Sequence, residues 1–299
     1  MVAVVELSSG PGTGAAYARA ALGMLPGARR GGALPEIEMV HRGVVVDRGH
    51  LAAYDRVCGF RLSDTLPATY PHVLAFPLAM RLMTMPDFPL PLIGLVHVAN
   101  RITVRRPLSA DSRLDLSVRA ADLRDHPRGR QFDLITTASI DGVEVWREVS
   151  TYLRVTRPAE PRQQKPASTR DESDISGISP AAARGEAVRG GAVWRVPARV
   201  GTDYAAVSGD RNPIHTSRLG ARLFGFPRPI AHGMWTAAHA LTALEGRLPT
   251  AYTMDVAFKQ PVLLPAKPAF TATPTATGWE FALSSKRPHL TGSVIAAAS

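Results

Sequence analysis

The alternation of apolar and polar residues in the second half of the chain predicts one long helix followed by several strands. From His232 to Leu244, apolar residues recur at the spacing of one helical face, and Gly246 supplies a stop signal. Four β-rich runs separated by Pro and Gly follow, at 252–259, 262–273, 279–285 and 290–296. One helix followed by antiparallel strands is an α+β pattern, in which the sheet buries one face against the helix.

The first half of the chain predicts the same elements in the same order. Tyr54 and Gly59 precede an apolar helix at 71–83, and Tyr204 and Gly209 stand 150 residues later, before the second helix. The strands expected in the first half are 96–105, 112–123, 131–140 and 143–155. A duplicated α+β domain is the economical explanation of this order.

Local signals mark a turn and a boundary within this plan. Asp141 and Gly142 predict a tight hairpin turn between two strands. Residues 157–187 are polar and dotted with proline, which is typical of a linker. We therefore predict an N-terminal domain at 1–156, a linker at 157–187 and a C-terminal domain at 188–299.

Length and composition are those of a globular protein. The chain has 299 residues, 45% of them hydrophobic, which fits about two ordinary domains. Its apolar stretches fall short of the ~20 residues that span a membrane, and its first residues lack the basic flank of a signal peptide. Cys58 is the single cysteine, so no intramolecular disulfide can form. We expect a cytoplasmic protein without a membrane span.

The net charge of +10 favours an anionic ligand or an acidic partner. The basic residues are scattered rather than grouped, and aromatic residues make up only 6% of the chain, so a nucleic-acid groove is not predicted. The arginine excess is equally compatible with a composition bias of the source genome. Charge alone therefore does not identify the partner.

The segment YAAVSGDRNPIH, which ends at His215, carries the most informative chemistry. Asp210, Asn212 and His215 lie within six residues, and Pro213 forces a turn between them. A carboxylate and an imidazole at such a turn can share a water molecule, one accepting its proton while the other orients it. Asn212 can brace the loop or hold a substrate. By spacing alone, a purely structural turn is the more common explanation of these residues.

The segment PIAHGMW places His232 and Gly233 at the predicted start of the second helix. Backbone N–H groups are unpaired at a helix start, and glycine allows a ligand carbonyl to approach closely. The N–H of Gly233 is therefore a candidate oxyanion donor. His232 either caps the helix or contacts the substrate. An acid, a base and an oxyanion donor then occur together in one repeat.

Together with VAFKQPVLLPA, these segments resemble the MaoC-like family of R-specific enoyl-thioester hydratases and dehydratases. The resemblance covers most of 190–299 and implies a double hotdog fold, in which a curved antiparallel sheet wraps a long helix in each half. It implies reversible addition of water to trans-2-enoyl thioesters, giving (3R)-hydroxyacyl thioesters. Asp210 and His215 would be the water-activating pair, Gly233 would bind the thioester oxygen, and Asn212 would support them. It implies a coenzyme A or acyl-carrier-protein thioester as substrate, and no metal or redox cofactor.

The first half departs from this pattern at the decisive place. Its corresponding loop is shorter, no histidine stands five residues after Asp64, and Ala75 or Phe76 stands near the place of the glycine. We expect this half to be non-catalytic, and the resemblance to double-hotdog hydratases implies that it supplies the acyl-chain pocket. The apolar candidates for that lining are Leu74, Phe76, Leu78, Met80, Met83, Met85 and Phe88.

Other candidates follow from the comparison of the repeats. Ser208 corresponds to Cys58, which indicates a small buried residue rather than a nucleophile, and we place Ser208 beside the substrate. Lys259 matches Arg105 at a strand end, and either could meet the phosphates of coenzyme A. The substrate-binding set is thus Ser208, Asn212, His232, Lys259 and Phe76. His97 and His239 are expected to be structural, and the glycine-rich segment 9–16 is a weak signal for a phosphate loop.

Two rival functions remain open at this point. A hotdog thioesterase would need a carboxylate aimed at the carbonyl carbon, and an acyl-binding subunit would need no water-activating pair. The Asp210 and His215 pair favours a hydratase over both. A single chain with two hotdogs allows a monomer, and further dimerisation stays open. The sequence does not determine acyl length, carrier or reaction direction.

Overall fold

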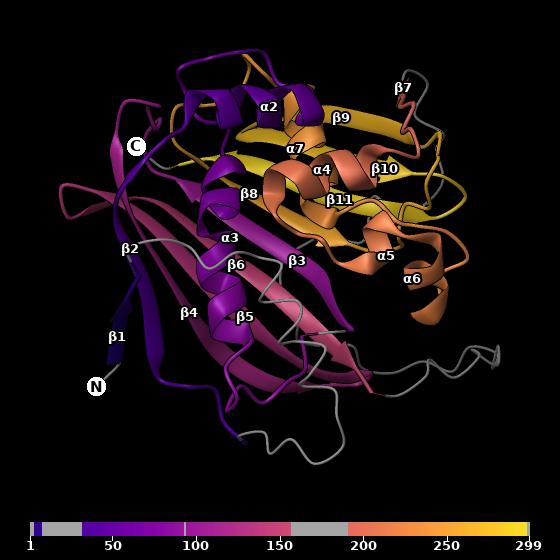
Figure 1. The fold of residues 1–299 in the computed structure, drawn as a ribbon. Coiled ribbons are helices and arrows are strands. Elements are labelled where there is room, and N and C mark those ends of the chain that lie inside the picture. The colour runs from indigo at the N-terminus through magenta and orange to yellow at the C-terminus, as the bar shows by residue number, and fades with distance from the viewer. Residues whose placement is uncertain (1–2, 8–31, 93, 157–190, 298–299) are drawn as a thin grey trace, which may run out of the picture.

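The computed structural model describes residues 3–7, 32–92, 94–156 and 191–297 (Figure 1). The first half contributes β1 (Ala3–Glu6), β2 (Ile37–Val45), β3 (Leu95–Val104), β4 (Arg113–His126), β5 (Gly129–Ile140) and β6 (Val143–Val155). The second contributes β7 (Ala192–Val193), β8 (Tyr252–Phe258), β9 (Ala269–Thr275), β10 (Gly278–Ser284) and β11 (Pro288–Ala296). Within the described residues they form one sheet in the order β1-β2-β4-β5-β6-β3-β8-β11-β10-β9-β7.

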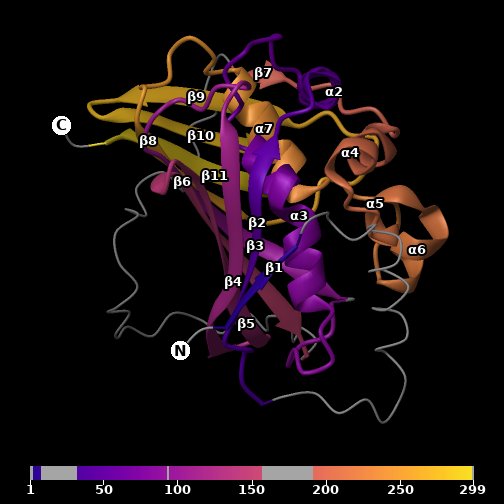
Figure 2. The ribbon, with the colours of Figure 1, turned by 60° about the vertical axis from the view of Figure 1, so that its left-hand side comes forward.

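The helices cover one face of this curved sheet, as the side view in Figure 2 shows. They are α2 (Arg48–Cys58), α3 (Tyr70–Met83), α4 (Val200–Ser208), α5 (Pro213–Thr216), α6 (Arg218–Leu223) and α7 (Gly233–Thr242). The central helices are α3 in the first half and α7 in the second (Figure 1). This arrangement confirms the predicted α+β class. No described helix is long and apolar enough to cross a membrane.

The two halves meet where β3 pairs with β8 in antiparallel register, from Ala99 opposite Ala257 to Val104 opposite Tyr252. The guanidinium of Arg101 binds Asp255 at 2.6 Å across this joint. Because each half has one strand at the joint, the two sheets form one continuous sheet. The central helices α3 and α7 therefore lie on the same face of this sheet (Figure 2).

Matching glycines end α2 in the first half and α4 in the second. Gly59 follows α2 with φ 91°, and Gly209 follows α4 with φ 75°. Glycine takes this left-handed conformation without the penalty that a Cβ imposes, so it stops a helix cleanly. The 150-residue repeat therefore reflects a shared backbone requirement. The predicted hairpin turn is confirmed too, with positive φ at Asp141 and Gly142.

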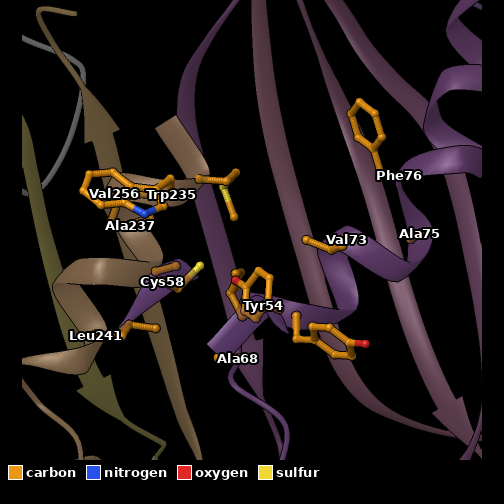
Figure 3. Packing of buried hydrophobic residues seen from close by; sticks show 14 of the residues in the cluster. Tyr54, Cys58, Ala68, Val73, Ala75, Phe76, Trp235, Ala237, Leu241 and Val256 are labelled. Atoms are coloured by element: carbon orange, nitrogen blue, oxygen red, sulfur yellow. The ribbon is translucent and has the colours of Figure 1, made fainter. Parts of the chain in front are cut away.

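A hydrophobic core continues across both halves (Figure 3). The indole N–H of Trp235 donates to the carbonyl of Val57 at 3.0 Å, and Nδ1 of His239 donates to the carbonyl of Cys58 at 2.6 Å. Cys58 is fully buried, which raises the pKa of its thiol. The structural roles predicted for Cys58 and His239 are confirmed, because both hold α2 against α7.

Several predicted boundaries were wrong or incomplete. The strand predicted at 262–273 begins only at Ala269, because prolines at 261, 265 and 268 lack the N–H that a ladder needs. Val262 instead accepts a hydrogen bond from Ala231 at 2.9 Å and so fixes the chain just before α7. The linker at 157–187 and the glycine-rich segment 9–16 lie outside the described residues, so neither prediction is tested.

Candidate active site

A cavity of about 370 Å³ lies between the two halves. It is lined by α3, β3 and β6 from the first half and by the loop after α4, the start of α7 and the end of β8 from the second. All eight predicted site residues contribute to its lining: Asp210, His215, Gly233, Asn212, Ser208, His232, Lys259 and Phe76. The fold thus brings together residues that are spread over much of the chain.

The loop that carries Asp210 is held by its own polar groups. The Asp210 amide donates to the hydroxyl of Ser208 at 3.2 Å, and the Asn212 amide donates to Oδ1 of Asp210 at 3.1 Å. Oδ1 of Asn212 accepts from the amide of Ile214 at 3.3 Å and caps α5, in which Pro213 is the first residue. The predicted turn is confirmed, and it runs directly into a short helix that carries His215.

His215 is held as a neutral imidazole. Its Nδ1 donates to the carbonyl of Ile230 at 2.8 Å, so the lone pair lies on Nε2. Burial lowers the pKa of His215, and the nearby charge of Asp210 only partly opposes this effect. At neutral pH the ring can therefore accept a proton.

His232 is the N-cap residue of α7, and its side chain packs on the imidazole of His215. Its Nε2 donates to the backbone carbonyl of Asp210 at 3.0 Å, and its ring stacks on His215 with centroids 3.7 Å apart. Burial, with the neighbouring His215, lowers its pKa to about 3. The expected capping position is confirmed, because His232 is the N-cap residue of α7, although its side chain makes no capping hydrogen bond.

Asp210, His215 and His232 each offer one side-chain atom, a carboxylate oxygen or a ring nitrogen, and these three atoms lie within 4.8 Å of one another. One water molecule can span such a distance between a carboxylate and an imidazole, because each hydrogen bond covers about 2.8 Å. Three such groups also have the spacing of metal ligands, which the separation of these residues in the sequence did not suggest.

Gly233 is the first residue of α7, as predicted. The first N–H groups of a helix have no partner within it, and the helix dipole favours negative charge there. A Cβ at this position would lie 3.1 Å from the ring of Phe258, so a larger residue would crowd the approach to the N–H. A close backbone approach is therefore what this glycine provides.

The structure adds a residue that the sequence reasoning missed. A Cβ on Gly201 would overlap the carbonyl oxygen of His215. The first turn of α4 thus packs directly on α5 and sets the position of the base. A glycine in the first turn of a predicted helix was the only available signal, and it does not show what packs against it.

The first half lines the cavity with fewer of the predicted residues than expected. Phe76, Met80 and Met83 line it, whereas Leu74, Leu78, Met85 and Phe88 do not and pack in or against the core. The placement of Ala75 or Phe76 at the glycine position was wrong, because α3 begins at Tyr70 and both residues lie in its second turn.

Two charged residues of the first half lie away from the cavity. The Asp64 carboxylate pairs with the guanidinium of Arg48, and Arg105 binds Glu144 at 2.8 Å. Neither lines the cavity, whereas Lys259, the counterpart of Arg105, does. These positions support the view that Asp64 has no part in catalysis.

A buried polar network in the first-half wall was also missed. Nδ1 of His72 lies 2.9 Å from Glu148, and Nδ2 of Asn100 donates to Glu148 at 2.6 Å and to Ser150 at 2.9 Å. His97, expected to be only structural, lines the cavity beside this network. Glu148 and Ser150 occupy buried positions of β6, so a polar residue at a core-facing place of a strand was the available signal.

The fold and this site define a class of protein. A model described as MaoC like domain matches residues 194–276. The chain is 39% identical over 286 residues to 3-hydroxyacyl-thioester dehydratase X of Mycobacterium tuberculosis, which covers 92% of this chain and 95% of that protein. The chain belongs to the MaoC-like family and is a hydro-lyase of the hydratase and dehydratase class.

Solved structures confirm the double hotdog. The crystal structure of HtdX from Mycobacterium tuberculosis has a TM-score of 0.73 and 35% identity, over 87% of this chain and 100% of that one. A MaoC-like dehydratase from Phytophthora capsici has a TM-score of 0.65 and 17% identity, over 88% and 95%, and shows the same fold. The chain also matches peroxisomal enoyl-CoA hydratase 2 of Arabidopsis thaliana with 50% identity over 38 residues, which are 13% of this chain and 12% of that protein.

Proposed function

We propose that the cavity catalyses the reversible hydration of trans-2-enoyl thioesters to (3R)-hydroxyacyl thioesters, with the reacting carbons beside Asp210 and His215. The observation that carries this assignment is the neutral imidazole of His215, of which one ring nitrogen lies within 4.8 Å of a carboxylate oxygen of Asp210. Both residues line a cavity that the start of α7 also lines. The related dehydratase and hydratase act on the same kind of substrate by name.

In this proposal, Asp210 orients a water molecule whose proton passes to Nε2 of His215 as the water oxygen bonds to the β carbon. The electrons of the double bond move toward the thioester, and the Gly233 N–H stabilises the resulting enolate oxygen. The imidazolium, stabilised by the Asp210 carboxylate, then returns its proton to the α carbon. One water is added without change of oxidation state, and both bonds form on the face that His215 occupies.

We propose that no metal or redox cofactor takes part. The steps above require only proton transfer and a backbone donor. The cluster of Asp210, His215 and His232 makes the metal question testable, because chelation would remove a divalent ion from it. Activity that is unchanged after exhaustive treatment with a chelator is the expected result, and activity that metal addition restores would contradict the proposal.

The carrier is a coenzyme A or acyl-carrier-protein thioester in this proposal. Lys259 and Arg128 are exposed and line the cavity, so both can meet a phosphate of the carrier arm. The net charge of +10 acts in the same direction. The single chain already contains both hotdog halves, so we propose that a monomer is competent, with a homodimer as the alternative.

The decisive experiment follows crotonyl-coenzyme A by loss of its conjugated enoyl absorbance while a thiol reagent monitors release of free coenzyme A. We expect hydration without thiol release. Thiol release without hydration would instead establish a thioesterase. Tight binding without either reaction would establish an acyl-binding protein.

A further inference from the structure

The first half of the chain places a charged pair in the wall of the cavity. Glu148 is 1% exposed and His72 lines the cavity with 13% of its side chain exposed. Burial disfavours both charges, but each is held by the other: Glu148 raises the pKa of His72, and His72 with Asn100 lowers the pKa of Glu148. Both effects favour the imidazolium and carboxylate form of the pair over the neutral form.

Stability does not account for this pair. Removing two charges from water costs several kcal/mol per ion, and apolar residues of similar volume often replace buried pairs without loss. The neighbours on the same face of α3, Phe76 and Met80, are apolar and line the same cavity. A charged pair in a wall otherwise suited to an alkyl chain points to a ligand group that it binds.

Two buried polar atoms near the pair have no hydrogen-bond partner among the described residues. Nδ1 of His72 is bonded to Glu148, so Nε2–H is the group that His72 can offer to a ligand in the cavity that it lines. Nε2 of His97 and the hydroxyl of Tyr204 are buried and unpaired, and both residues line the cavity. Since buried polar groups are almost always hydrogen-bonded, these atoms indicate where ligand oxygens bind.

The network lies near the reacting end of the cavity. The ring of His97 packs against Phe258 with centroids 4.9 Å apart, and Phe258 packs on Gly233. Along α3, the cavity residues run from His72 in the first turn to Met83, about 16 Å away at 1.5 Å per residue. An acyl chain that extends from Gly233 along α3 therefore passes the polar network first and apolar residues afterwards.

We propose that the first half selects acyl thioesters that carry a neutral oxygen, a hydroxyl or a carbonyl, a few carbons beyond the reacting double bond. His72 donates its Nε2–H to this oxygen, Glu148 acts as the positioning residue that keeps His72 charged and oriented, and His97 lines the same subsite. A neutral oxygen fits better than a carboxylate, because Glu148 already neutralises His72 and Asp210 adds a negative charge nearby. This inference rests on the proposed hydration activity.

The test compares hex-2-enoyl-coenzyme A with its 5-hydroxy and 6-hydroxy derivatives, which differ by one oxygen. For the native protein we expect kcat/KM at least about tenfold higher with one of the hydroxylated substrates, the size of one hydrogen bond to a charged donor. In His72→Phe combined with Glu148→Gln, which leaves no unpaired charge, this ratio falls to about one. Glu148→Gln alone lowers the ratio partly, because the neutral His72 remains a donor.

Matched variants separate selection from general damage. Phe76→Leu, on the same face of α3, lowers kcat/KM for all three substrates by the same factor and keeps the ratio. The inference would be overturned if the double variant of His72 and Glu148 lost kcat/KM equally with all three substrates. It would also be overturned if the native protein showed no preference for a hydroxylated substrate. If no thioester is hydrated, calorimetry with hexanoyl- and 5-hydroxyhexanoyl-coenzyme A still measures the preference, so failure of the hydration proposal is distinguishable.

Discussion

The two halves of this chain use one fold for different chemistry. In both, a helix ends at a glycine with positive φ, but only the second half continues into the loop of Asp210 and the short helix of His215. The first half instead places His72 and Glu148 on its central helix and on a strand. The first half therefore lacks a loop like that of Asp210 but still places polar residues beside the cavity. Its polar residues lie on rigid elements, where they suit selection.

The largest effect is expected when Asp210 or His215 of the second half is replaced. His215→Ala and Asp210→Asn each remove one of the groups that share the water, and we expect kcat for crotonyl-coenzyme A to fall by about 10²–10⁴, the usual range for acid and base catalysis. Circular dichroism should remain native. Retained activity in both variants would refute the assignment of the site to the second half.

A next large effect is expected from the contact that positions the base. In Gly201→Ala, the new Cβ overlaps the His215 carbonyl and displaces α5. A misplacement of about 1 Å can reduce rate about 100-fold. Gly32→Ala is the matched control, because no atom lies within 4 Å of its added Cβ. Steady-state kinetics should show loss of kcat in the first variant only, and an equal result in both would contradict the positioning role.

Gly233→Ala tests the start of the second central helix with a smaller change. The Cβ would lie 3.1 Å from Phe258, so that ring must shift by a few tenths of an ångström. Because the backbone N–H is retained, we expect a loss of about tenfold in kcat/KM, below the full value of one oxyanion donor. A native value of kcat/KM would show that the substrate carbonyl does not approach this glycine.

The neutral histidines of the second half should make stability depend on pH. Burial lowers the pKa of His232 to about 3 from 6.5, so below pH 6.5 the unfolded chain binds more protons than the folded one. The contribution of this group to the free energy of unfolding is therefore constant above pH 6.5 and falls as the pH drops below 6.5. Urea unfolding at several pH values should show a shallower fall in His232→Gln. The difference between the two proteins isolates His232 from His72, whose raised pKa acts in the opposite direction.

The smallest effect is expected at the carboxylate that the first half retains. Asp64 is exposed, and its ion pair with Arg48 lies outside the cavity. Exposed ion pairs contribute about 0–1 kcal/mol, so Asp64→Asn should change the free energy of unfolding by no more than about 1 kcal/mol and leave kcat unchanged. A large loss of activity would show that the first half takes part in the chemistry through this loop.

Much of the fold could be predicted because its elements are long and regular. β3 to β6 of the first half and α7 of the second were predicted close to their observed bounds, since alternation and helical spacing persist over many residues. β2 was missed because a bulge between His41 and Val44 interrupts its alternation. α5 and α6 have four and six residues, too few for a helical period to be visible.

The sequence by itself determined the duplication, the element order and the second-half pair, because a turn places residues that are close in sequence close in space. Only the tertiary structure decided that His72 and His97 line the same cavity, that Glu148 binds His72 behind this wall, and that Gly201 packs on His215. Those contacts join residues separated by up to 76 positions within the first half alone. They depend on the register of strands and the packing of helices, which no local pattern encodes.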